Sequence, residues 1–175
     1  VCEFTREKDP PRLINAASGG NWIEGAGDIL DSHHYPGPRM RLLDTAMVNV
    51  LGEYGGIGYP IEGHLWQEGK NWGYVKFQST DQVTDKYVEF AKVLEGLVKT
   101  DMCAAAVYTQ TTDVEGEVNG FYTYDREVLK MDIERVREAN THVINTKSDV
   151  KMIPEVSFYK RDGDGRKTAL YAIEN

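Results

Sequence analysis

The ten residues MVNVLGEYGG, Met47 to Gly56, decide the fold of this chain. Met47 to Leu51 is a nearly unbroken apolar run, typical of a strand that is covered on both faces in a parallel sheet. Glu53 follows this run and precedes Gly55 and Gly56, which let a ligand approach the backbone. The stretch therefore predicts a buried parallel strand that presents a carboxylate at its C-terminal end.

Three further strands are predicted around this one, at Leu13–Ala17, Asp28–Tyr35 and Met102–Thr109, the last of them buried. Between two of them lies a long stretch, Ile57–Phe77, that is rich in glycine and aromatic residues and has no clean period. We interpret this stretch as a functional loop, because long irregular segments in compact domains are often binding loops.

The helices follow from caps and spacing. Cys2–Lys8 reads as a short helix that Pro10 stops, because proline lacks an amide donor. Ser79 and Gln82 can form a capping box for an amphipathic helix that extends to about Val98. Asp125 can cap a second one, whose apolar face carries Leu129, Ile133 and Val136. Strands and helices thus alternate up to about Asn140, which predicts an α/β fold with a parallel sheet.

The last part of the chain has a different character. Residues 153–160 and 168–173 flank an Asp-Gly-Asp-Gly turn and predict a β-hairpin. The turn lacks the later bidentate glutamate of a calcium loop, so a plain turn is the better interpretation. We expect residues 1–147 to form the α/β domain and residues 148–175 to be a hairpin extension.

Composition excludes several classes of function. With 41% hydrophobic and 27% charged positions the chain falls in the ordinary globular range. The formal net charge of -8 gives no positive field that would attract nucleic acid. The apolar stretches are far shorter than the roughly 20 residues that cross a bilayer, so we expect a soluble protein without a membrane partner. Cys2 and Cys103 match neither a metal spacing nor a disulfide framework, and the compartment stays open between cytoplasmic, periplasmic and secreted.

Candidate catalytic groups lie where the strands end, because side chains there project from a rigid scaffold into the loop-walled mouth of a parallel α/β fold. These positions hold His33, His34 and Tyr35, then Glu53, then Tyr108. Glu53 is a candidate nucleophile or base, with a solvated loop glutamate as the alternative. Neighbouring histidines on a strand point to opposite faces, so at most one of the two faces the site. With no further cluster of histidine or cysteine, we expect neither a metal nor a cofactor.

Four sequence fragments resemble a known family in their order along the chain. They are Asp9-Pro10-Pro11-Arg12-Leu13, Asp28-Ile29-Leu30-Asp31 through His34-Tyr35-Pro36, Gly52-Glu53-Tyr54-Gly55, and Asn119-Gly120-Phe121 followed by Asp125-Arg126. These fragments are similar to signatures of the family 2 glycoside hydrolases, the β-galactosidase and β-glucuronidase group, over about residues 3–140. The resemblance implies the C-terminal half of a (β/α)8 TIM barrel, with strands five to eight and their helices.

The resemblance also implies roles for individual residues in the retaining hydrolysis of β-glycosides. Glu53 takes the place of the nucleophile, and Tyr35 that of the tyrosine that hydrogen-bonds it. Tyr108 stands where the family commonly has a tryptophan under the sugar, which leaves the exact substrate open. Further candidates for contact with a carbohydrate substrate are His33, His34, Trp66 and Trp72, each with a structural role as the alternative.

The family's acid/base glutamate follows an asparagine, and no Asn-Glu dipeptide occurs in this chain. We therefore expect a half barrel that pairs with a second copy or with the missing N-terminal half, because its sheet edges are open. The isolated chain should have negligible glycosidase activity. Non-catalytic carbohydrate binding and a purely structural fragment are the competing interpretations. The sequence does not decide between galactosidic, glucuronidic and mannosidic substrates.

Overall fold

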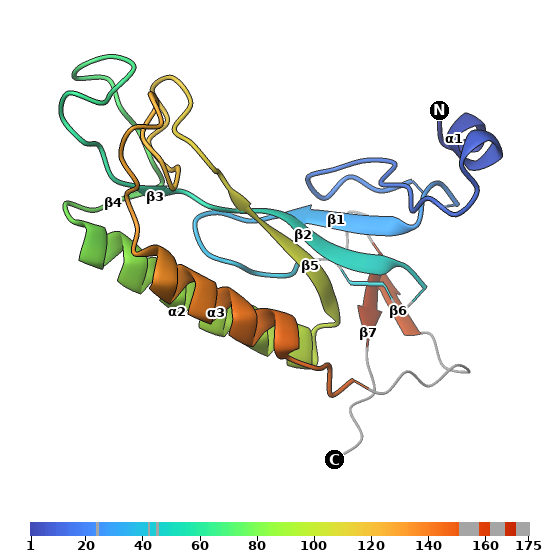
Figure 1. The fold of residues 1–175 in the computed structure, drawn as a ribbon. Coiled ribbons are helices and arrows are strands. Elements are labelled where there is room, and N and C mark those ends of the chain that lie inside the picture. The colour runs from blue at the N-terminus through green and yellow to red at the C-terminus, as the bar shows by residue number, and fades with distance from the viewer. Residues whose placement is uncertain (24, 42, 45, 151–157, 162–166, 171–175) are drawn as a thin grey trace.

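A computed structural model describes residues 1–23, 25–41, 43–44 and 46–150 and the backbone of residues 158–161 and 167–170. Its main feature is a three-stranded parallel sheet in the order β1 (Ile29–His33), β2 (Val48–Gly55), β5 (Cys103–Thr109), seen in Figure 1. The predicted α/β class with a parallel sheet is thus confirmed. The apolar run at the start of the MVNVLGEYGG stretch forms the central strand, which continues through Glu53 to Gly55.

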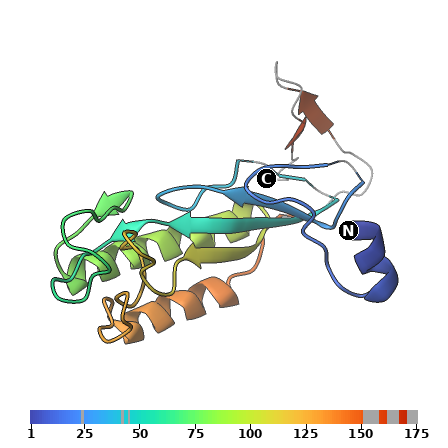
Figure 2. The same cartoon turned by 90° about the horizontal axis from the view of Figure 1, so that it is seen from above.

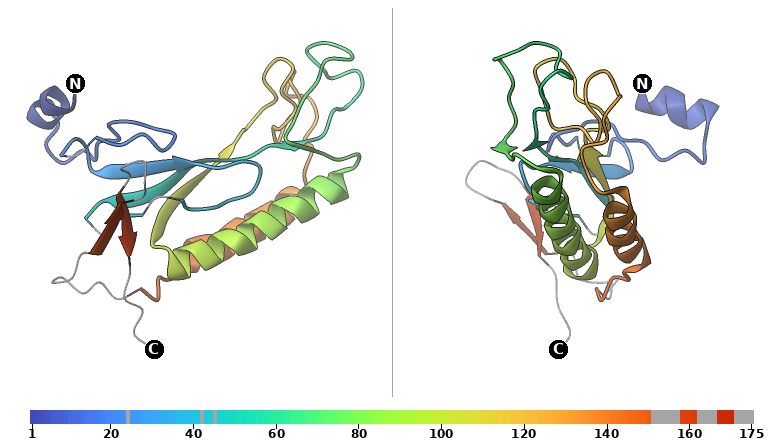
Figure 3. Two further views of the ribbon diagram at one scale, coloured as in Figure 1. Left: turned by 180° about the vertical axis from the view of Figure 1, so that it is seen from behind. Right: turned by 60° about the vertical axis from the view of Figure 1, so that its left-hand side comes forward.

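Two helices lie side by side along one face of this sheet (Figure 3). The longer, α2 (Thr80–Thr100), begins where predicted: Ser79 is its N-cap, and the Ser79 hydroxyl accepts a hydrogen bond from the Gln82 amide at 3.3 Å. Helix α3 (Ile133–Asn145) packs beside it. Among the described residues, no helix is long and apolar enough to span a bilayer.

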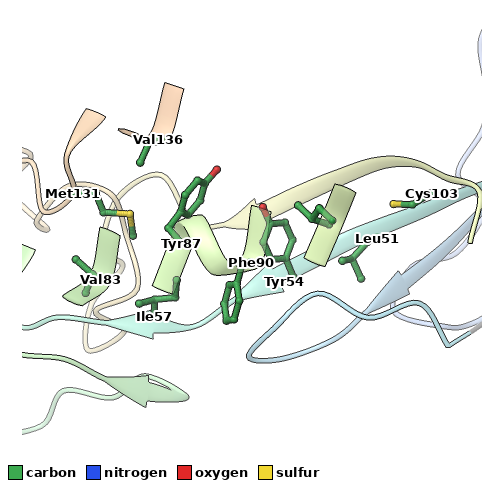
Figure 4. Packing of buried hydrophobic residues seen from close by; sticks show 10 residues of the cluster. Leu51, Tyr54, Ile57, Val83, Tyr87, Phe90, Cys103, Met131 and Val136 are labelled. Atoms are coloured by element: carbon green, nitrogen blue, oxygen red, sulfur yellow. The ribbon is translucent and has the colours of Figure 1, made fainter. Parts of the chain in front are cut away.

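The core lies between β2 and the two helices, as Figure 4 shows. Leu51 and Tyr54 of β2 pack against Phe90 of α2, the two rings of Tyr54 and Phe90 meeting edge-on at 6.3 Å. Leu51 and Tyr54 are three residues apart, yet both belong to the core, because the pairing with β5 is irregular between them. Gly52 and Glu53 fall within this irregularity, and neither belongs to the core cluster.

The smaller elements surround this frame. Helix α1 (Cys2–Lys8) forms as predicted but buries none of its residues and stands apart from the sheet (Figure 2). The long loop after β2 carries two short strands, β3 (Ile57–Gly58) and β4 (Val75–Lys76), which pair in parallel. The predicted hairpin is present as β6 (Phe158–Arg161) and β7 (Lys167–Leu170), while its predicted turn falls outside the described residues.

Two predictions about strands were wrong. Leu13–Ala17 is not a strand, because its recorded backbone-to-backbone hydrogen bonds with the neighbouring segment involve Ile14 alone, whose carbonyl accepts from the amides of Asp28 and Ile29. Hydrogen bonds at one residue do not form the repeating pattern that pairs two strands. The strand at β5 exists, but it is not buried: Ala104 and Ala105 are exposed, and Val107 is 52% exposed.

The start of the second amphipathic helix was also predicted wrongly. Helix α3 is capped by Asp132, whose carboxylate accepts from the amides of Glu134 and Arg135. Asp125 instead closes a turn, in which it accepts from the Thr123 hydroxyl and the Glu127 amide at 2.6 and 3.0 Å. An aspartate that caps a turn and one that caps a helix satisfy the same kind of amide, so local sequence did not separate them.

Candidate active site

The site is built on the C-terminal ends of β1 and β2. The Tyr35 hydroxyl donates to Glu53 Oε2 at 2.7 Å. Backbone hydrogen bonds hold the two segments in register beyond the end of β1, from the His34 amide to the Glu53 carbonyl and from the Gly55 amide to the Pro36 carbonyl. The tyrosine and the carboxylate are therefore positioned by main chain on both sides of their contact.

Tyr35 acts as a neutral donor to this carboxylate. Burial raises the pKa of the Tyr35 hydroxyl far above its ordinary value, and the negative charge of Glu53 raises it further. The hydroxyl therefore keeps its proton at any physiological pH. A neutral donor held against a carboxylate stabilises its charge without removing it, which suits a nucleophile.

The side chains of His33 and His34 make different contacts, as expected because neighbouring residues of a strand point to opposite faces. His33 Nδ1 lies 3.4 Å from Glu53 Oε2, and its Nε2 lies 3.7 Å from Asp31 Oδ1. His34 Nδ1 instead lies 2.7 Å from the Gly37 carbonyl. Of the two histidines, only His33 has a recorded side-chain contact with Glu53.

A carboxylate that the sequence did not single out lies beneath this group. Asp31 is 4% exposed; its Oδ1 accepts from the Gly52 amide at 3.0 Å, and its Oδ2 accepts from Asn15 Nδ2 at 2.8 Å. A Cβ atom at Gly52 would collide with this carboxylate. Asp31 thus fixes the backbone directly before Glu53, and glycine at position 52 is what makes the contact possible.

An aromatic wall extends from Tyr35. The Tyr74 ring stacks on it with centroids 4.4 Å apart and planes 8° apart, and the Trp72 ring meets Tyr74 at 5.8 Å. Tyr74 and Trp72 are 51% and 48% exposed. Flat exposed rings beside a carboxylate are the kind of surface on which the apolar faces of sugars stack. Trp72 was predicted at the mouth, whereas Tyr74 was missed among the aromatics of the loop.

A second carboxylate, Glu117, joins this wall from the segment after β5. The Trp72 amide donates to the Gly116 carbonyl, the Val118 amide donates to the Trp72 carbonyl, and Asn119 Nδ2 donates to Glu117 Oε1 at 2.7 Å. Burial raises the pKa of Glu117, the bond from Asn119 opposes that shift, and the charge of Glu53 adds to it. The two carboxylates are thus within electrostatic reach of each other.

A buried ion pair holds the segment that carries Glu117. Lys130 is 1% exposed, and its Nζ contacts Asp113 Oδ1 at 2.6 Å and the carbonyls of Val118 and Tyr59 at 3.0 and 3.1 Å. Burial lowers the pKa of Lys130, and the charge of Asp113 opposes that shift. This contact ties the loop after β5 to the loop after β2; Figure 1 shows the two loops gathered at one end of the sheet.

Two of the predicted substrate residues, Tyr108 and Trp66, have no recorded contact with Glu53 among the described residues. The Tyr108 ring packs against Tyr54, Tyr87 and Phe121, and its hydroxyl donates to the Asn119 carbonyl at 2.9 Å. It belongs to the side of the sheet that faces α2, so the described contacts do not bring it to Glu53. Trp66 is exposed in the long loop and contacts Tyr124 at 5.0 Å.

One group of possible metal ligands occurs among the described residues, made of His64, Asp125 and Glu127. His64 Nδ1 is hydrogen-bonded to Asp125 Oδ2 at 2.8 Å, and the other Asp125 oxygen closes the turn described above. His64 lies in the loop after β2, whereas Asp125 and Glu127 lie in the segment after β5, and no contact recorded in the described part of the chain joins the three to Glu53.

Comparison with protein-family models and with curated proteins gave no match to this chain.

Proposed function

We propose that this chain carries the nucleophile side of the active site of a retaining β-glycosidase similar to family 2 glycoside hydrolases. The observation that supports it is the 2.7 Å hydrogen bond from Tyr35 to Glu53 at the C-terminal ends of parallel strands, beside His33. Exposed aromatic rings next to this pair supply a surface on which a sugar can stack.

In this proposal the reaction is a double displacement. A Glu53 oxygen attacks the anomeric carbon and forms a glycosyl ester, while the bond to the leaving oxygen breaks. Water then cleaves the ester and restores the carboxylate. Tyr35 stabilises the charge of Glu53 before attack and after release, and His33 is placed to contact a sugar hydroxyl near the reacting carbon.

The leaving oxygen needs a proton from a second carboxyl about 5 Å from the nucleophile. We propose that this group lies on another half of the barrel, so that the described sheet would correspond to strands from the second half of a (β/α)8 barrel. Support comes from the open edge at β5, where a groove of about 640 Å³ is lined by residues of β5, α2 and α3. Its apolar lining is suited to a further strand or helix.

The experiment is kinetic and uses the complete polypeptide that contains this chain, or the chain recombined with the preceding half. With nitrophenyl β-glycosides, Glu53→Gln should lower kcat by at least about a thousandfold, because it removes the nucleophile. Glu138→Gln removes the same charge from an exposed position on α3 and should leave kcat unchanged. Equal activity of the two variants would refute the proposal.

A second candidate is carbohydrate binding without catalysis, which the exposure of Tyr74 and Trp72 favours. A binder would show no turnover in any assembly, and its affinity for sugars would barely change with Glu53→Gln. For a binder, Trp72→Ala would weaken sugar binding. For a catalyst, Glu53→Gln would abolish turnover.

A further inference from the structure

We infer that Glu117 is a specificity residue that makes the Glu53 site select neutral sugars and reject uronic acids. This inference rests on the proposed glycosidase function and names the substrate class of the same site. Three features carry it: the position of Glu117 on the aromatic wall, the fixed orientation of its carboxylate, and the charges around it.

The position follows from a chain of contacts. Glu117 is paired with Trp72 through main-chain bonds on either side of it. The Trp72 ring meets Tyr74, the Tyr74 ring stacks on Tyr35, and the Tyr35 hydroxyl reaches Glu53. A sugar that lies along this wall with its anomeric carbon at Glu53 therefore extends toward Glu117.

The carboxylate of Glu117 is held in place on one side. Asn119 is fully buried, and its Nδ2 donates to Glu117 Oε1 at 2.7 Å. Gly73 gives Asn119 the room to do so, because a Cβ atom at Gly73 would lie 2.6 Å from Asn119 Oδ1. Glu117 also has Gln110 as a side-chain hydrogen-bond partner and is only half-buried, so the outward side of its carboxylate can accept from a ligand hydroxyl.

The carboxylates of the site make no recorded ion pair with a lysine or arginine among the described residues. In the same part of the chain, the recorded hydrogen bonds of Glu53, His33, Asp31 and Glu117 include none either. The nearby ammonium of Lys130 is buried against Asp113 and faces backbone carbonyls, so it is not free to bind a ligand anion. A sugar carboxylate would meet like charges and lose its hydration, whereas a sugar hydroxyl could donate to Glu117.

The test compares kcat/KM for nitrophenyl β-glucuronide with kcat/KM for the neutral β-galactoside, β-mannoside and β-glucoside, in the complete polypeptide. The parent enzyme should prefer a neutral sugar. Glu117→Gln keeps the shape and the bond from Asn119 but removes the charge, so it should raise the glucuronide-to-neutral ratio by about ten- to a hundredfold. Glu115→Gln, an exposed carboxylate in the same loop, should leave the ratio unchanged.

The outcomes separate this inference from the proposed function. A parent enzyme that prefers the glucuronide, or a ratio that Glu117→Gln and Glu115→Gln leave equally unchanged, overturns the role of Glu117 while Glu53-dependent turnover stands. Absence of turnover on every glycoside overturns both. The inhibition constants of a neutral sugar lactone and of an acidic one give a second readout, and their ratio should shift in the same direction in Glu117→Gln.

Discussion

The Tyr35 hydroxyl donates a hydrogen bond to the Glu53 carboxylate. Tyr35→Phe removes the 2.7 Å hydrogen bond and leaves the ring that stacks on Tyr74. We expect kcat of the complete polypeptide to fall about 10²- to 10³-fold, the usual cost of one donor to a reacting oxygen, with little change in KM. Tyr122→Phe, at an exposed tyrosine, is the control. Unchanged kcat in Tyr35→Phe would show that the hydroxyl has no part in turnover.

Lys130 contributes to the stability of the fold through its buried ion pair with Asp113. Lys130→Met leaves the Asp113 carboxylate buried without its partner, and we expect the free energy of unfolding to fall by about 3–5 kcal/mol. Adding Asp113→Leu should recover part of this loss, since the buried charge is then gone. Urea unfolding measures both.

The matched surface change is Arg137→Met, whose partner Glu134 is exposed on α3. It should cost less than about 1 kcal/mol, because exposed ion pairs contribute little. Similar losses for Lys130→Met and Arg137→Met would contradict the account of the buried pair.

Single residues of the site were predictable to different degrees. Glu53, Tyr35 and His33 stand at the ends of apolar strands, and that position is visible in sequence. Asp31 and Asn15 were missed because their contact joins residues 16 apart, across a loop with no period. Tyr74 and Glu117 were missed because their place depends on how two loops meet, which no local pattern encodes.

At the scale of elements, the two glycines at positions 52 and 96 should respond in opposite ways to alanine. At Gly52 the added Cβ meets the Asp31 carboxylate, which is buried and held by two hydrogen bonds, so we expect a loss of about 1–3 kcal/mol in the free energy of unfolding. At Gly96, within α2, nothing lies within 4 Å of the added Cβ. Gly96→Ala should gain up to about 1 kcal/mol from helix propensity. Thermal or urea unfolding decides, and a Gly52→Ala variant as stable as the parent chain would contradict the packing at Asp31.

The elements themselves were predicted best where the pattern and the packing agree. The apolar run of β2 packs against the apolar face of α2. Because the residues that make these contacts are the apolar ones, the hydrophobic pattern predicted both elements. The exposure of β5 could not be foreseen, because Val107 and its neighbours have the composition of a covered strand. Asp125 was wrongly predicted as a helix cap, because the turn that it closes uses the same kind of side-chain hydrogen bonds.

In the molecule as a whole, the exposed apolar strand β5 is the surface through which we expect association with another chain. We expect the isolated chain to self-associate at micromolar concentration and to have negligible glycosidase activity. Val107→Lys should weaken this association, because a lysine on an exposed strand opposes pairing. Val114→Lys changes an equally exposed valine, 51% against 52%, on a loop and should not. Sedimentation velocity checks both, and a monomeric parent chain would contradict the expectation.

If Glu53 is the nucleophile, the sugar becomes bound to it as an ester that can be trapped. A neutral 2-deoxy-2-fluoro glycosyl fluoride, incubated with the complete polypeptide, should label one carboxylate per chain through an ester bond. Peptide mass spectrometry should place the label on Glu53, and Glu53→Gln should abolish it. A label on another carboxylate, or unaltered turnover without any label, would contradict the account.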